Sequence, residues 1–182
     1  MKKILVILGS TRQGRKGELV SNWLIAYLKN HPSPSLDFDL SDLRTEALPI
    51  LDSPINPSTG QYPEGKVTQW AQKIASFDGF IIITPEYNHG YPAVLKNALD
   101  LIYAEWNYKP VAFVSYGGVS GGVRAVEQLR QVAIELRLIP ISESVSIPFI
   151  RTAFDDQGHL VSPERIEKTL DSLLSALAKY FG

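Results

Sequence analysis

Three stretches of this sequence gather residue types that bind anions and flat ring systems. Residues 9–17 combine hydroxyl groups with arginine and lysine side chains. Residues 85–91 crowd tyrosine, asparagine and histidine into a short loop, and residues 116–122 are rich in glycine. The chain has no cysteine, which excludes thiolate chemistry and cysteine-bound zinc. Together these stretches predict a ligand with an anion at one end and a hydrogen-bonding ring at the other.

The stretch 9–17 has the composition of a phosphate cradle. Ser10 offers a hydroxyl donor, and the guanidinium groups of Arg12 and Arg15 match phosphate oxygens. Its glycines do not fit the dinucleotide fingerprint. They have the spacing of a P-loop, but an Arg-Lys pair replaces the required Lys-Ser/Thr, so the magnesium-binding hydroxyl is missing. The alternative interpretation is a solvated basic loop.

The other two stretches suit the ring of the ligand. Tyr87, Asn88 and their neighbours form a planar platform with polar edges, and the alternative is an ordinary connection with surface aromatics. Gly117 and Gly118 permit close approach of the backbone, so that their amide groups face an electron-rich ring edge. A flexible turn is the alternative there. A flavin mononucleotide (FMN) matches this combination better than a nucleoside monophosphate.

The periodicity of the sequence indicates how these stretches are held. Apolar runs or alternating patterns predict strands, and each is followed by a helical pattern of apolar residues. The alternation predicts a three-layer, doubly wound α/β fold with a five-stranded parallel sheet, whose ligands bind at the carboxyl ends of the strands. The expected strands are 4–8, 36–40, 80–83, 111–115 and 138–147, and the expected helices lie within 19–28, 64–76, 93–102, 123–136 and 163–181.

One connection, 41–63, is unusually long and contains four prolines. A connection of that length is typical of a functional lid or an interface segment, and a mobile surface loop is the equal alternative. Ser162 and Pro163 are expected to cap and begin the last helix.

The composition indicates one domain over residues 1–182. Hydrophobic residues make up 45% of the chain, charged residues 20%, and the net charge is −1. This balance indicates neither nucleic acid nor a membrane surface as a partner. The apolar run 4–8 is too short for a signal peptide, and the lack of cysteine suits a reducing cytoplasm.

Four motifs carry a resemblance to a known family, the NADPH-dependent FMN reductases, which include FMN-dependent quinone, azo-dye and chromate reductases. The resemblance spans the first strand to the fourth helix and implies a flavodoxin-like sheet of order 2-1-3-4-5, with FMN at the switch point. The motifs are Gly9-Ser10-Thr11-Arg12, Pro85-Glu86-Tyr87-Asn88, Leu95-Lys96-Asn97-Ala98-Leu99-Asp100 and Ser115-Tyr116-Gly117-Gly118.

The same resemblance implies a set of cofactor-binding residues, with no metal and no obligate side-chain acid or base. Ser10 and Arg12 would hold the phosphate, with a second group of residues near it. The ring would meet residues of the second and third stretches. The second phosphate group comprises Arg15, Gly17 and Glu18, and the ring set comprises Pro85, Glu86, Tyr87, Asn88, Ser115, Tyr116, Gly117 and Gly118.

The resemblance further implies an enzyme that takes hydride from NADPH or NADH and passes electrons through FMN to a small-molecule acceptor. The alternative is a flavodoxin-like FMN electron carrier that does not oxidise NAD(P)H, although such carriers are usually strongly acidic. A flavin-free binding module and a P-loop phosphotransferase are weaker alternatives. The family tends to form dimers or dimers of dimers, for which Trp106 and Tyr108 are candidate interface aromatics. Burial against their own subunit is the equal alternative for these two side chains.

Overall fold

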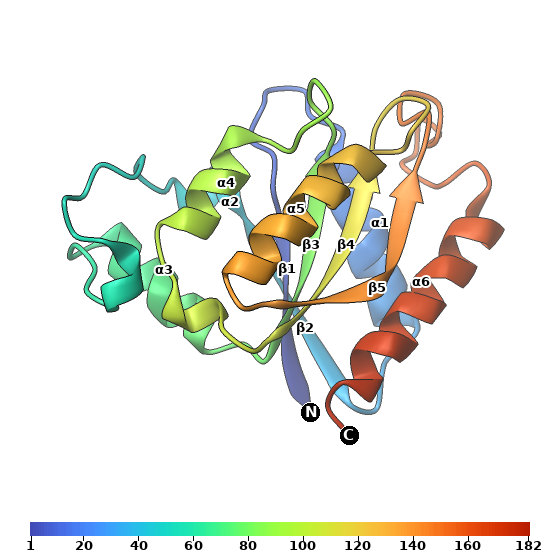
Figure 1. Cartoon of the computed structure of the whole chain (residues 1–182). Helices are drawn as coiled ribbons and strands as arrows, with labels where there is room; N and C mark the ends of the chain where they lie inside the picture. Colours follow the sequence, from blue (N-terminus) through green and yellow to red (C-terminus); the bar gives the residue numbers. More distant parts are fainter.

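The computed structural model describes residues 1–182 and contains a five-stranded, all-parallel sheet in the order β2-β1-β3-β4-β5 (Figure 1). This order confirms the predicted doubly wound α/β fold. The inner strands are continuous apolar runs because helices cover both of their faces. The strands are β1 (Lys2–Leu8), β2 (Leu36–Asp42), β3 (Gly79–Pro85), β4 (Pro110–Tyr116) and β5 (Ile139–Ile147).

Two buried clusters, one on each face of the sheet, form the core. Along β1, Ile4, Val6 and Leu8 face the helices α1 and α6, whereas Leu5 and Ile7 face α3, α4 and α5. Alternate residues of one strand therefore serve opposite layers. None of the helices combines the length and apolar character needed to cross a bilayer. The helices are α1 (Gly17–Asn30), α2 (Leu43–Glu46), α3 (Lys66–Ala75), α4 (Ala93–Asp100), α5 (Val123–Glu135) and α6 (Pro163–Lys179).

The structure differs from the sequence expectations mainly at segment ends. The connection after β2 begins with the short helix α2, which the lack of periodicity had hidden, and it contains a 3-10 turn at Pro57–Thr59. A second 3-10 turn, Ala104–Trp106, follows α4. Ser162 occupies the N-cap position of α6 as predicted, but its side chain makes no capping hydrogen bond. Pro163 begins the helix as expected.

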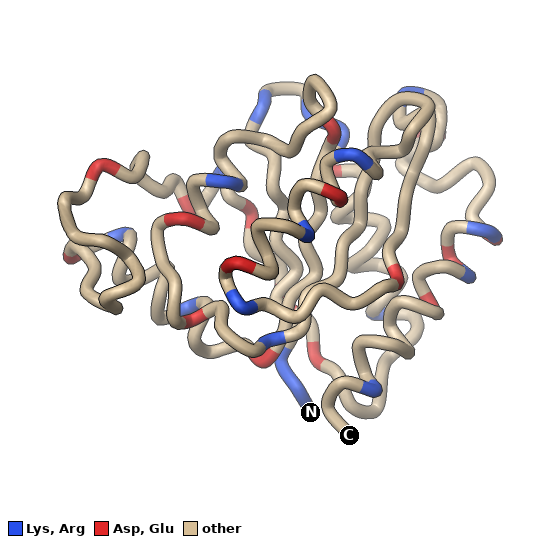
Figure 2. Tube along the Cα trace, in the orientation of Figure 1, with Lys and Arg blue, Asp and Glu red and all other residues tan.

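The loops after β1, β3 and β4 lie at the carboxyl edge of the sheet, at the top of Figure 1. They are the three chemically distinctive stretches of the sequence. Figure 2 shows basic residues along the first of these loops, while both signs of charge are mixed along the rest of the chain. The fold therefore brings an electropositive loop beside the aromatic and glycine-rich ones.

The two aromatic side chains proposed for an interface have different environments. Trp106 is fully buried in its own chain, where its indole Nε1–H donates to Leu99 O at 3.1 Å. Its ring packs edge-on against Trp70 and Phe80, with centroids 6.1 and 4.9 Å away. Trp106 is therefore a core residue, and the interface hypothesis is wrong for it. Tyr108 is 69% exposed.

We predict that Trp106→Phe lowers the free energy of unfolding by about 1–3 kcal/mol, because it removes a buried hydrogen bond and leaves a small cavity. The matched change Tyr108→Phe should stay within about 0.5 kcal/mol of the wild type, as expected for an exposed side chain. Urea unfolding followed by far-ultraviolet circular dichroism measures both values. Equal stability of the Trp106 variant and the wild type would contradict this account of the core.

Candidate functional site

Ser10 and Tyr116 join the first and third loops underneath the site. Ser10 is fully buried, and its Oγ lies 3.1 Å from Tyr116 Oη. Burial raises the pKa of Tyr116 to about 12, so this hydroxyl stays protonated at neutral pH. Gly17, the first residue of α1, packs on the same hydroxyl, and a Cβ at this position would lie 2.6 Å from it. Only glycine allows this close approach.

Arg15 is turned into the protein and not toward the open edge of the site. Its side chain is 1% exposed, and all five of its N–H donors are used. Two pair with the carboxylate of Asp42, two with Glu18 Oε1 at 3.0 and 3.1 Å, and one with the carbonyl oxygen of Ser10. No N–H donor of Arg15 therefore remains for a phosphate, so Arg15 makes no direct contact of this kind in the present conformation.

Asp42, at the end of β2, holds this cluster together. Burial alone would raise the pKa of its carboxyl, but the hydrogen bonds and charge of Arg15, with the Arg44 backbone amide, lower the pKa below its ordinary value. Its Oδ1 accepts from that amide at 2.9 Å and so caps α2. The parallel register places Asp42 beside Leu8, directly next to the first loop.

Arg44 extends from α2 to the back of the first loop. Its Nη2–H donates to Arg12 O at 2.7 Å and its Nε–H to Thr11 O at 3.3 Å. Its Nη1–H pairs with Glu18 Oε1 at 2.8 Å. Consequently Glu18 is shared between Arg15 and Arg44, and it contributes to the loop through these two side chains.

The backbone amides of Thr11, Arg12 and Gln13 donate no hydrogen bond within the chain. Three consecutive unpartnered N–H groups, followed by the N-terminus of α1, form an electropositive backbone surface that favours an anion. The Arg12 guanidinium adds charge, and it lies 6.0 Å from the centroid of the Tyr87 ring. An anion such as the phosphate that the sequence predicts would suit this surface, with backbone amides as donors beside the expected Arg12.

The second loop contains a tight reverse turn. Tyr87 and Gly90 exchange backbone hydrogen bonds of 2.8 and 2.9 Å, and the two residues between them, Asn88 and His89, have φ values of 50° and 67°. Positive φ at both central positions is typical of a type I′ turn, which asparagine tolerates better than most residues. Gln128 of α5 supports the turn, with its Nε2–H donating to His89 O at 2.9 Å.

Glu86 connects the second loop to the third. Its carboxylate accepts from Ser120 Oγ at 3.0 Å and from Arg124 Nη1 at 2.8 Å, and its side chain is 9% exposed. Burial opposes ionisation, but the Arg124 and Ser120 hydrogen bonds lower the pKa of Glu86 below its ordinary value. Glu86 therefore remains a carboxylate near neutral pH and holds the two loops together.

The third loop is held through its carbonyl groups. Gly117 O accepts from the Ile150 amide at 2.9 Å, and Gly118 O accepts from the Phe149 amide at 2.8 Å. The Gly117 amide itself donates to Ile147 O at 3.2 Å, so only the Gly118 amide of the expected pair is available. A hollow of about 450 Å³ lies beside this loop and is lined by Gly117, Gly118, Phe149, Ile150, Arg151 and Thr152.

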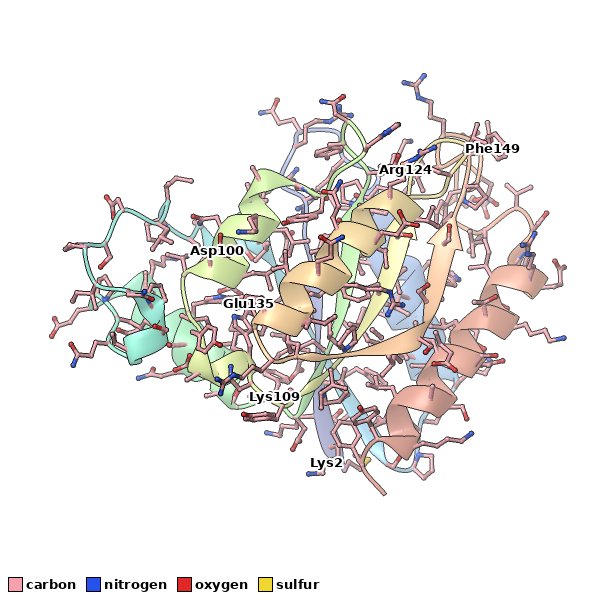
Figure 3. The ribbon with its side chains drawn as sticks, in the orientation of Figure 1. Lys2, Asp100, Lys109, Arg124, Glu135 and Phe149 are labelled. Carbon is pink, nitrogen blue, oxygen red and sulfur yellow. The ribbon has the colours of Figure 1, made fainter.

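Ser115 lies beneath the third loop and is 1% exposed. Its Oγ donates to Gly121 O at 2.8 Å, so the hydroxyl holds the turn and does not face the hollow. Figure 3 shows Arg124 and Phe149 at this edge of the molecule, and Lys2 and Lys109 at the opposite end. Arg124 and Phe149 thus lie at the same edge of the sheet as the three loops.

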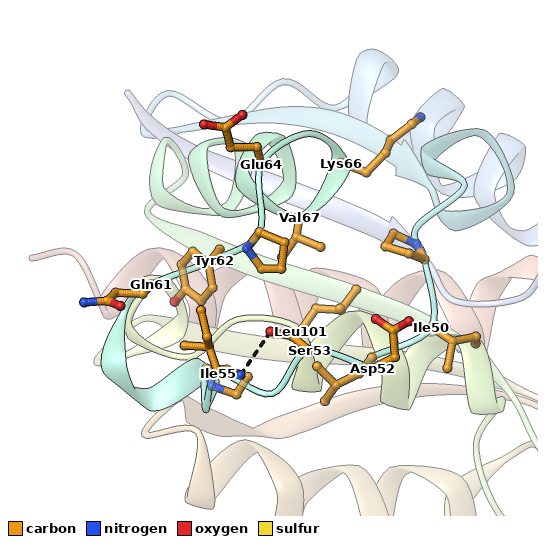
Figure 4. Close-up of a pocket in the computed structure, with 14 residues that line it drawn as sticks. Ile50, Asp52, Ser53, Ile55, Gln61, Tyr62, Glu64, Lys66, Val67 and Leu101 are labelled. Atoms are coloured by element: carbon orange, nitrogen blue, oxygen red, sulfur yellow. Dashed lines mark hydrogen bonds between the residues drawn. The ribbon is translucent and has the colours of Figure 1, made fainter.

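The long segment after α2 is attached to the body of the protein and forms a separate hollow. Asn97 of α4 accepts from the Leu51 amide at 2.9 Å and donates to Pro49 O at 2.8 Å. The hollow, of about 230 Å³, is bounded by residues 49–67 of this segment and by Leu101 (Figure 4). It shares no lining residue with the three loops and is therefore distinct from the candidate site.

The structure brings most of the predicted residues together, but it also involves residues that sequence reasoning missed. Asp42, Arg44, Arg124 and Gln128 support the loops from outside the three stretches. A signal for Asp42 was available, because a sheet of order 2-1-3-4-5 places the end of β2 beside the first loop. Arg44, Arg124 and Gln128 lie on helices, and tertiary packing decides which side of each helix faces the loops.

Comparisons with known proteins agree with this geometry. An NAD(P)H-dependent FMN reductase of Schizosaccharomyces pombe is 41% identical over 150 residues, covering 80% of this chain and 74% of that protein. An NADPH:quinone oxidoreductase of Arabidopsis thaliana is 34% identical over 152 residues, covering 77% and 74% of the two chains.

Among solved structures, the flavoenzyme NAD(P)H:(acceptor) oxidoreductase FerB of Paracoccus denitrificans superimposes with a TM-score of 0.73 at 25% identity, covering 99% of this chain and 97% of FerB. The family profile described as NADPH-dependent FMN reductase matches residues 2–152, which include all three loops. The chain therefore belongs to the NADPH-dependent FMN reductase family.

Proposed function

We propose that this chain is an NAD(P)H-dependent FMN oxidoreductase acting on a small electron acceptor, built as one domain over residues 1–182. The observation that carries the proposal is the meeting of three loops: unpartnered amides at 11–13, the platform at 85–91 and the hollow beside Gly117 and Gly118. Family membership supports the same cofactors, FMN and NADPH or NADH.

The residues divide by the part of FMN that they serve. The amides of residues 11–13 and the Arg12 side chain bind the phosphate, while Ser10, Arg15, Gly17 and Glu18 shape the loop from behind. Pro85, Glu86, Tyr87 and Asn88 form or support the surface under the ring. Ser115, Tyr116, Gly117 and Gly118 line or brace its polar end.

Bound FMN would supply the redox chemistry between the nicotinamide and the acceptor. The protein binds and orients the reactants. The Gly118 amide offers a preorganised donor for negative charge at the polar end of the ring, by the logic of an oxyanion site. We assign no side chain as an obligate acid or base. Arg124 holds Glu86 as a carboxylate, so Glu86 has no proton to donate near neutral pH.

The acceptor is a flat, conjugated small molecule. The Arabidopsis relative is named for quinone reduction, and a relative from Staphylococcus haemolyticus, 31% identical over 137 residues, is an FMN-dependent NADPH-azoreductase. The apolar, exposed Phe149, 58% accessible beside the third loop, suits such a substrate. The absence of cysteine favours the cytoplasm as the working compartment.

The chain also works as a homo-oligomer, a dimer or a dimer of dimers. Ile50 is 73% exposed, and Leu51 and Ile55 beside it are partly exposed on the segment that Asn97 holds against α4. Several exposed large apolar side chains on one ordered segment favour association. This assigns the segment 41–63 an interface role.

We predict that the purified protein shows flavin absorption bands, and that adding NADPH without oxygen bleaches them. Addition of a quinone should then restore the flavin bands, and the protein should catalyse repeated reduction of the quinone by NADPH. Bands that persist with both NADPH and NADH would favour the electron carrier. Absence of bands after incubation with FMN would contradict the three-loop site.

We predict that Glu86→Gln leaves the shape of the kcat/KM profile unchanged between pH 5.5 and 8.5. The pKa of Glu86 lies below its ordinary value of about 4.3, so the carboxylate does not titrate in this range. The lowered pKa stabilises the fold above about pH 4, and that contribution is lost as the pH falls through the folded-state pKa. A basic or acidic limb that disappears in the variant would show that Glu86 transfers protons.

We predict that Ile50→Asp shifts the protein to a smaller species in sedimentation velocity, because the new charge would be buried at the subunit contact. Ile134→Asp on α5 is the matched control, since Ile134 is 66% exposed and lies on another face. A wild type that sediments as a monomer, or an Ile50 variant that stays associated, would exclude this interface.

A further inference from the structure

We propose that Arg44 is a positioning residue for the FMN phosphate: it holds the first loop in the conformation in which backbone amides meet the phosphate. The inference rests on the proposed function, because it concerns the same cofactor site. It also assigns Arg15 an indirect role in binding.

Three consecutive carbonyl groups of the loop are bound by guanidinium groups. Ser10 O accepts from Arg15, while Thr11 O and Arg12 O accept from Arg44. Both arginines are in turn held by carboxylates, since Glu18 accepts from both and Asp42 pairs with Arg15. Each carbonyl therefore has a charged donor on the side of the loop that faces β2 and α2.

The peptide bonds of the chain contain no cis isomer. In a trans peptide the carbonyl of one residue and the amide of the next point in opposite directions. Binding the carbonyls of residues 10, 11 and 12 therefore turns the amides of residues 11, 12 and 13 away from the guanidinium groups. All three of these amides lack a partner within the chain.

Arg44 is the member of this network that can be tested without opening the core. Its side chain is 40% exposed, whereas the Arg15 side chain is 1% exposed and its loss would leave Asp42 and Ser10 O unsatisfied. Arg44 accounts for two of the three carbonyl contacts. Its removal should loosen the loop while leaving the ring-binding loops, which it does not contact, unchanged.

A positive charge near a phosphate could strengthen binding without positioning anything, and Arg44→Lys separates the two effects. Lysine keeps the charge but lacks the planar fork that spans two carbonyls. Arg130 provides the control. Its guanidinium also donates to two carbonyls, Ile141 O at 2.7 Å and Ser142 O at 3.0 Å, but these belong to β5 at the other edge of the sheet.

The experiment measures dissociation constants for FMN and for riboflavin, which lacks the phosphate, by flavin fluorescence with the full-length, flavin-depleted protein. We expect Arg44→Met to weaken FMN binding by about tenfold and Arg44→Lys by about threefold, the range for losing hydrogen bonds from a charged group. Riboflavin binding should change less than about twofold in both. Arg130→Met should leave the ratio of the two constants at its wild-type value.

Two results would overturn the inference alone. Wild-type FMN affinity in Arg44→Lys would mean that charge suffices, and equal weakening of FMN and riboflavin would mean that Arg44 supports only the fold. A wild-type chain that binds neither flavin would overturn the proposed function, and this inference with it. Selective loss of FMN affinity in both Arg44 variants, but not in the Arg130 variant, would establish the positioning role.

Discussion

A trans peptide bond presents its carbonyl oxygen and its amide hydrogen on opposite sides, and this constraint organises both ends of the candidate site. At the first loop, guanidinium groups bind the carbonyls of residues 10–12, which leaves the amides of 11–13 for a ligand. At the third loop, the amides of Ile150 and Phe149 bind the carbonyls of Gly117 and Gly118, so the next amides face away from that segment. In both places the protein makes a donor surface by satisfying acceptors on the reverse side.

The reverse side of the first loop depends on a buried guanidinium. Removing Arg15 from water is costly, and the cost is offset because carboxylates of Asp42 and Glu18 and the Ser10 carbonyl use every donor. Such a network has few alternative arrangements that satisfy all its members, so it favours a single loop conformation. The sheet order makes it possible, because β2 pairs with β1 and ends beside Leu8. The interaction that fixes the ligand loop is thus a consequence of strand topology.

The layers and the convergence of the three loops were predictable from the residues, because unbroken apolar runs identify strands covered on both faces and parallel strands open their loops at one edge. The strand order was predictable only through the family resemblance. The directions in which the side chains point were not predictable from the sequence. An arginine at position 15 suggests a side chain that binds phosphate. The direction of this side chain, however, depends on Asp42, which is 27 positions away in the chain. The availability of the Gly117 amide depends on Ile147 of β5.

The turn at Asn88-His89 lacks the glycine that usually marks a type I′ turn, and α2 is too short to show periodicity. Each of these features is decided by tertiary contacts that a local pattern does not contain.

Binding a phosphate through amides suits a cofactor that stays bound. Backbone donors that the fold already holds lose little conformational entropy when they bind, whereas a free arginine side chain must be ordered. The loop also lacks the Lys-Ser/Thr pair of a P-loop, so no hydroxyl stands at the P-loop position that binds the magnesium ion on which phosphoryl transfer depends. A cradle of this kind holds a phosphate monoester without activating it. In the function that we propose, the phosphate serves as an anchor, and the reactive part of the ligand is its other end, toward Tyr87 and the hollow beside Gly118.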